Sequence, residues 1–88
     1  MTVDFAKVVM KDIEGNGVIA DVRKQLGNQL YMQGRNIEEC ELGKKIYFAD
    51  GALKISDGDA QVIRQFVSGW SYVARQGIED MLNNSLED

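Results

Sequence analysis

The sequence contains no histidine and no proline, only one cysteine and no long hydrophobic run. Without histidine the chain has no imidazole for general base catalysis, proton transfer or metal binding. Cys40 by itself can form neither an internal disulfide nor a thiolate metal site, which is typical of the reducing cytosol. The longest uncharged stretch, residues 65–74, is shorter than the roughly twenty apolar residues of a membrane span. We therefore expect a cytoplasmic protein that uses no metal, cofactor or membrane.

An excess of positive charge is also missing. The chain has ten basic and fourteen acidic residues, and residues 1–56 contain eight of each, so the whole net charge of −4 lies in residues 57–88. A nucleic-acid ligand needs a basic protein face that releases counterions from phosphates, and an anionic membrane surface needs the same. Nucleic acid is therefore not the expected partner.

The chain of 88 residues has the length of one folded domain, which we place at residues 1–88. Apolar residues make up 44% of the chain and charged residues 27%, which is the composition of an ordinary globular protein. A chain of this length has room for one hydrophobic core.

The N-terminal third predicts a β-hairpin. Residues 3–13 contain three consecutive apolar residues, Val8, Val9 and Met10, which favours a strand buried on both faces near its middle. Asn16 and Gly17 then predict a type I′ turn, and residues 18–21 return as the second strand. The apolar residues 52–55 predict a third short strand that joins this hairpin.

Four helices complete the predicted fold. The first covers residues 22–32, with Asp21 as N-cap and Gly34 at its end, and the second covers residues 37–48 after Asn36. The helical period from residue 57 onward predicts two helices, 57–67 and 71–83, separated at Ser68-Gly69; one continuous helix remains the alternative. The expected fold is thus α+β, a small antiparallel sheet on about four helices in the order ββααβαα.

Glycines inside the predicted helices indicate close packing. Gly27, Gly43 and Gly77 each cost about 1 kcal/mol relative to alanine in a helix. We expect a neighbouring element to approach the helix backbone at these three positions.

The remaining reactive residues favour structural roles. Cys40 lies on a predicted apolar stripe with Ile37, Gly43 and Tyr47, so we expect a buried, inert thiol. Asp57 and Asp59 lie at a predicted helix start, where carboxylates cap the helix and match its dipole. No catalytic, cofactor-binding or metal-binding residue is predicted, and we expect a protein that is not an enzyme.

Two functions remain open. The first is binding of another protein, or of a second copy of this chain, in an assembly or accessory role. The candidate interface residues are aromatic or methionine side chains close to the ends of the predicted helices: Tyr31, Met32, Trp70, Tyr72 and Met81. The crowding of apolar residues in residues 57–88 places the expected partner surface on the C-terminal helices.

The alternative is a winged-helix-like transcription regulator. The two helices around Gly34 have the spacing of a helix-turn-helix, and the hairpin would be the wing. The recognition helix would begin with Glu38, Glu39 and Glu41, which repel DNA. A basic groove on the folded protein would favour this alternative, and a contiguous apolar patch would favour protein binding.

Three segments carry a resemblance: residues 26–31 read LGNQLY, residues 42–47 read LGKKIY and residues 50–55 read DGALKI. In this order they resemble short uncharacterised proteins encoded in tailed-phage and prophage gene clusters, over about residues 7–82. The resemblance implies an accessory or assembly role in a phage or mobile element, and it assigns no functional residue.

Overall fold

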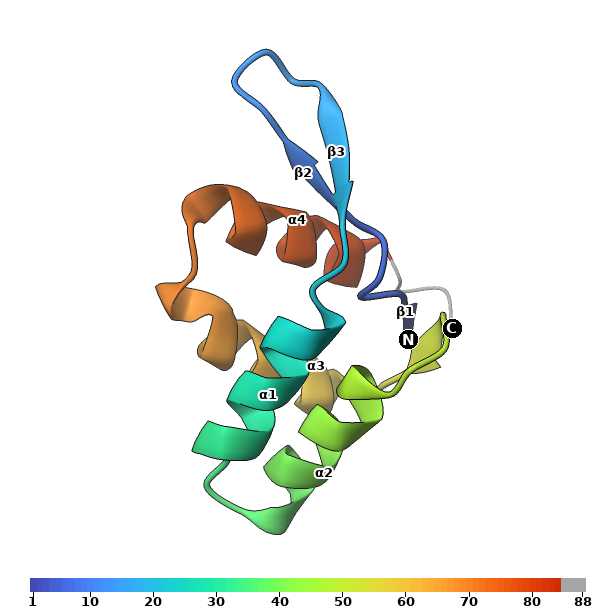
Figure 1. Cartoon of the computed structure of the whole chain (residues 1–88), viewed down its shortest axis with the longest axis vertical. Helices are drawn as coiled ribbons and strands as arrows, with labels where there is room; N and C mark the ends of the chain where they lie inside the picture. The colour runs from blue at the N-terminus through green and yellow to red at the C-terminus, as the bar shows by residue number, and fades with distance from the viewer. Residues whose placement is uncertain (85–88) are drawn as a thin grey trace.

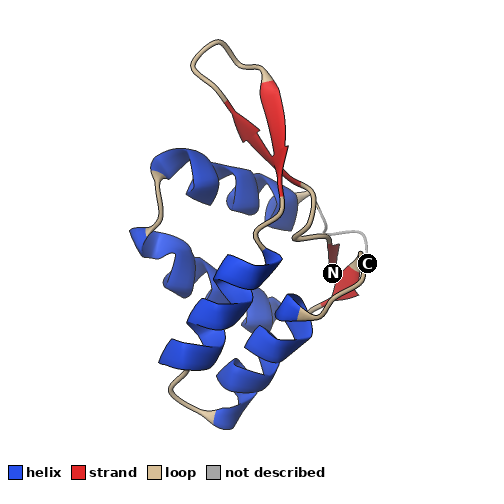
Figure 2. Cartoon of the chain, viewed as in Figure 1, coloured by secondary structure: helices blue, strands red, loops and turns tan. Residues whose placement is uncertain are grey.

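The structure, a computed structural model, describes residues 1–84 of the chain. Within this range the chain forms four α-helices and four short β-strands, which confirms the expected α+β class (Figure 1, Figure 2). None of the helices in residues 1–84 is long and apolar enough to cross a membrane. The elements are β1 (Thr2–Val3), β2 (Val8–Lys11), β3 (Gly17–Ala20), α1 (Arg23–Gln33), α2 (Ile37–Tyr47), β4 (Leu53–Lys54), α3 (Asp57–Phe66), a 3-10 helix η1 (Val67–Gly69) and α4 (Tyr72–Asn83).

The strands of the described residues form two separate antiparallel pairs. The hairpin β2–β3 is present as predicted, but β4 pairs with β1 instead of joining the hairpin. The reason is a turn after Val3, where Asp4 accepts hydrogen bonds from Lys7 N–H through its carbonyl and from Ala6 N–H through its carboxylate. This turn divides the predicted strand 3–13 into β1 and β2.

The hairpin turn differs from the predicted type I′ turn. Gly15 is the residue with positive φ, at +87°, and its N–H donates to the carbonyl of Asp12. The Asp12 carboxylate accepts from the backbone N–H groups of Glu14 and Asn16. Because Asp12 organises the loop in this way, Asn16 keeps a negative φ and the expected Asn-Gly turn does not form.

Side chains cap three of the four α-helices in residues 1–84. Asn36 Oδ1 accepts from Glu39 N–H at the start of α2, and Ser56 and Asp59 form a capping box at the start of α3. Ser71 accepts from Ala74 N–H at the start of α4. Helix α1 begins one residue later than predicted, so Val22 is its N-cap, although the Asp21 carboxylate still accepts from Arg23 N–H.

The C-terminal segment forms two helices, as predicted, and the continuous helix is excluded. Helix α3 passes into η1, Trp70 is extended, and α4 runs in a new direction above α3 (Figure 1). The Ser68 hydroxyl donates to the carbonyl of Gln65, which helps to stabilise the break.

The expected close packing at the helix glycines is confirmed. Helices α1 and α2 lie side by side in opposite directions (Figure 1), and a Cβ on Gly43 would lie 2.6 Å from the carbonyl oxygen of Gly27. A Cβ on Gly77 of α4 would lie 2.5 Å from the carbonyl oxygen of Val9 in β2. Glycine therefore allows backbone-to-backbone contact in both places.

The buried face of α2 differs from the predicted stripe. Its buried residues are Glu39, Leu42, Gly43 and Ile46, whereas Ile37 is 72% exposed and Cys40 is only half-buried. The prediction was wrong because contact with α1 at Gly43 directs Leu42 and Ile46 into the core, which turns Ile37 toward solvent. The buried side chains form one cluster, contributed by β1, β2 and the four helices of residues 1–84 together with Phe5, Val22, Ile55 and Val67, and Leu53 of β4 packs against it from a half-buried position.

Candidate interaction surface

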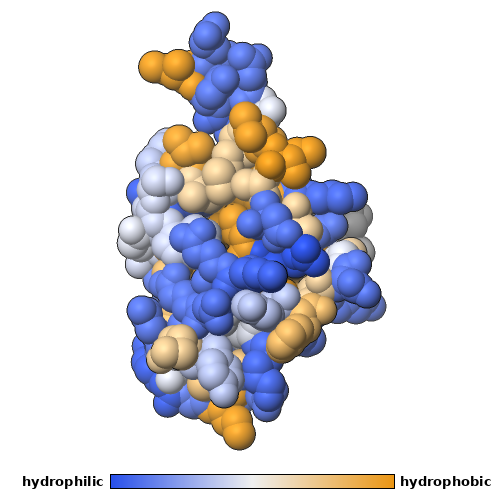
Figure 3. Space-filling model, in the orientation of Figure 1, coloured by the Kyte–Doolittle hydropathy of each residue, from blue (hydrophilic) through white to orange (hydrophobic). Residues whose placement is uncertain are grey.

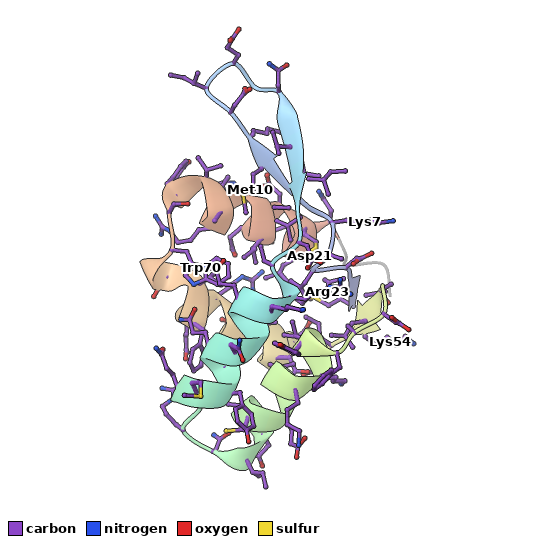
Figure 4. All side chains as sticks on the ribbon, viewed as in Figure 1. Lys7, Met10, Asp21, Arg23, Lys54 and Trp70 are labelled. Atoms are coloured by element: carbon purple, nitrogen blue, oxygen red, sulfur yellow. The ribbon has the colours of Figure 1, made fainter. Side chains whose placement is uncertain are left out.

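The hairpin projects beyond the helices, and only its base packs on α4 (Figure 1). At that base Val8 is fully buried, and Met10, labelled in Figure 4, packs against the core from a half-buried position. Gly77 lets the backbone of β2 approach α4 closely, as described above. A groove of about 630 Å³ remains between the hairpin and α4.

Apolar side chains are concentrated around this groove. Ten large apolar side chains are exposed in the described part of the chain, and six of them belong to the hairpin or to the first turn of α4. Figure 3 shows apolar atoms on the hairpin and where it meets the helices. We call this region the hairpin–α4 surface, and its exposed apolar residues, all of which line the groove, are Val9, Ile13, Val18, Tyr72 and Val73.

The contribution of the hairpin to this surface was not predicted. The run Val8-Val9-Met10 suggested a strand covered on both faces, but a two-stranded hairpin has α4 on one side only, so Val9 is 46% exposed. The turn residue Ile13 is fully exposed. An apolar residue inside a turn between Asp12 and Glu14 is the signal in the sequence that could have indicated this surface.

The predicted interface residues do not form one cluster. Tyr72 belongs to the hairpin–α4 surface, while Tyr31 and Met32 are exposed near the end of α1. Trp70 and Met81 are half-buried against the core.

Trp70 lies at the break between α3 and α4 (Figure 4), and the polar end of its side chain makes a hydrogen bond to helix α1. Its indole Nε1 donates to Gln29 Oε1 at 2.6 Å, and Gln29 Nε2 donates to the carbonyl of Phe66 at 2.6 Å. Trp70 therefore ties the break between α3 and α4 to helix α1.

Acidic side chains lie beside most of the cations that would form a basic groove. Arg23 contacts Asp21 at 2.7 Å (Figure 4), and Arg35 contacts the buried carboxylate of Glu39 at 2.9 Å. Lys44 lies 3.6 Å from Glu41, so three of the five cations on α1, on α2 and in the turn between them have an acidic neighbour.

These pairs also change the acidity of their carboxyl groups. Hydrogen bonds from the Arg23 guanidinium lower the pKa of Asp21 to about 2. Hydrogen bonds from the Arg35 guanidinium and its backbone N–H lower the pKa of Glu39. Both carboxylates are therefore charged at neutral pH and offset the positive charge beside them.

The other candidate residues have local structural roles. Asp59 caps α3, and the Cys40 thiol donates to the carbonyl of Tyr31 at 3.5 Å. Among residues 1–84 no group of histidine, cysteine or acidic side chains is arranged to hold a metal ion.

Comparisons of the chain with protein-family models, with curated proteins and with solved structures found no match. The geometry of its surfaces is therefore the basis on which a function can be proposed.

Proposed function

We propose that this protein acts by binding another protein through the hairpin–α4 surface, without catalysis. The observation that carries the proposal is the accumulation of exposed apolar residues around the groove between the hairpin and α4. Contiguous exposed apolar surface is costly in water and marks interaction sites. The groove also has a rigid base, because α4 and β2 are in backbone contact at Gly77.

Two further features support a binding role. The half of the hairpin near Ile13 has no helix beneath it (Figure 1), and isolated two-stranded hairpins are marginal in water, so a partner would stabilise it. An assembly or accessory role, of the kind that the resemblance to phage-encoded proteins implies, would use such a surface.

The winged-helix alternative has less support. Helices α1 and α2 lie side by side in opposite directions, whereas the helices of a helix-turn-helix cross at a large angle. Glu38 and Glu41 remain exposed at the start of α2, and Arg35 just before this helix is paired with Glu39.

Site-specific photo-crosslinking in the native host tests the proposal. We expect Tyr72→p-benzoylphenylalanine to give an adduct of defined mass, whose size distinguishes a second copy of this chain from another protein. Ile37→p-benzoylphenylalanine is the matched control, because Ile37 is equally exposed but lies on α2. The proposal fails if position 72 gives no adduct beyond those from position 37, or if Val73→Asp leaves the adduct unchanged.

A further inference from the structure

Helices α1 and α2 contain the same short pattern. Residues 26–31 and 42–47 both read Leu-Gly, two polar residues, Leu or Ile, and Tyr. In each copy the two aliphatic residues enter the core and the glycine contacts the glycine of the other copy. A Cβ on Gly27 would lie 2.7 Å from the Gly43 carbonyl oxygen, and the reciprocal distance is 2.6 Å. The two patterns therefore cross at their glycines.

This crossing creates an aromatic groove on the outer face of the helix pair. The glycines form its floor, and the tyrosine that follows each of them by four residues, Tyr31 or Tyr47, lines the groove together with Phe48. Its volume is about 370 Å³, within the range of small-ligand sites. Phe48 is 76% exposed and meets the Tyr47 ring edge-on, with 4.9 Å between ring centroids.

The charged groups at the aromatic groove are positive. Lys44 lines it, and the ammonium of Lys24 lies 5.8 Å from the centroid of the Tyr47 ring. Lys44 Nζ lies 3.6 Å from Glu41 Oε2, which is longer than a hydrogen bond, and both side chains are more than half exposed. The Lys44 ammonium can therefore turn toward a ligand without losing a hydrogen bond to Glu41.

We propose that the aromatic groove binds a small ligand that carries an aromatic ring and an anionic group. The ring would lie on the glycine floor between Tyr31 and Phe48, because aromatic rings favour stacked and edge-on contacts. The anion would be bound by Lys44, and the Asn28 side chain, which also lines the groove, supplies a neutral hydrogen-bond donor. This site is separate from the hairpin–α4 surface and does not depend on the function proposed for that surface.

Titration of the full chain, followed through backbone amide NMR signals, tests this proposal with three probes. Phenyl phosphate has both the ring and the anion, benzyl alcohol has only the ring, and inorganic phosphate has only the anion. We expect phenyl phosphate to shift the amide signals of Gly27, Asn28 and Gly43 and to bind at least about tenfold more tightly than either other probe. Equal affinity for phenyl phosphate and one of the other probes would overturn the proposal. The absence of saturable shifts at these amides would do the same.

Two lysine variants separate the groove from general charge effects. Lys44→Gln should weaken phenyl phosphate binding about fivefold, the scale of an exposed charge pair. Lys45→Gln removes the same charge from the next residue, which does not line the groove, and should change the affinity less than about twofold. Equal weakening by the two variants would show that the anion responds to net charge alone and would contradict the assigned role of Lys44.

Discussion

Gly77→Ala tests the contact that holds the hairpin on α4. The new Cβ would lie 2.5 Å from the carbonyl oxygen of Val9 and 3.1 Å from Val8 Cγ1. Carbon–oxygen contacts normally lie at about 3.3 Å or more, so β2 must move away from α4 by about 0.8 Å. A backbone oxygen cannot rotate out of the way as a side chain can. The cost must therefore come from separating the two elements.

The magnitude follows from the packing around this contact. A gap of up to about 1 Å forfeits a quarter to a half of the dispersion energy between packed atoms, and Val8 and Ile78 are both fully buried here. Overpacking costs up to about 3 kcal/mol, and the better helix propensity of alanine returns about 1 kcal/mol. We expect the free energy of unfolding to fall by about 2 kcal/mol and Tm to fall by about 8–16 °C.

Gly58→Ala is the matched control for this substitution. Gly58 lies in the first turn of α3, where a Cβ would meet only Ser56 Oγ at an ordinary 3.7 Å. This variant should gain about 0.5–1 kcal/mol from helix propensity. Thermal and urea unfolding followed by circular dichroism measure both variants. Our account of the hairpin contact is refuted if Gly77→Ala is as stable as the wild type and leaves the amide shifts of β2 unchanged.

Two other substitutions test the ion pair at the start of α2 and the state of the thiol. Glu39→Gln removes the charged partner of Arg35. The pKa of Glu39 is lowered from 4.5 in the folded protein, so the ionised Glu39 carboxylate stabilises the fold above pH about 4.5. This stabilisation is lost as pH falls through the lowered pKa. Urea unfolding should therefore show a gap between wild type and Glu39→Gln that narrows from pH 7 to pH 3, and a constant gap would contradict this account. The half-buried Cys40 should react with a thiol reagent more slowly than in the unfolded chain but faster than global unfolding permits. A rate equal to that of the unfolded chain would show that the thiol is fully exposed, and a rate equal to that of global unfolding would show that it is fully buried.

Much of the local structure could be predicted from the sequence, because it depends on neighbours along the chain. Asn36 and Asp59 take part in the caps of the helices where they were expected, and the chain breaks at Ser68-Gly69 after α3 as expected. The glycines inside the helices predicted that another element approaches the helix backbone, because glycine destabilises a helix relative to alanine. Only the structure showed which elements approach: Gly43 meets Gly27, while Gly77 meets β2.

The candidate surfaces depended on contacts between distant residues, so they could not be obtained in the same way. Tyr31 and Tyr72 were identified as surface aromatics, but the structure places them on different faces, one in the aromatic groove and one beside the hairpin. The exposure of Val9 and Val18 follows from the position of α4 relative to the hairpin, which no local pattern encodes.

The sequence by itself determined the helices, whose ends lie within one residue of the predicted ones, because caps and glycine costs act within a few residues. Tertiary structure decided the strand partners, since β1 and β4 are separated by most of the chain and meet only after Asp4 turns it. It also decided the buried face of α2, where contact with α1 at Gly43 outweighs the apolar stripe through Ile37. An apolar pattern shows that a residue can be buried, whereas the packing of the neighbouring elements decides whether it is.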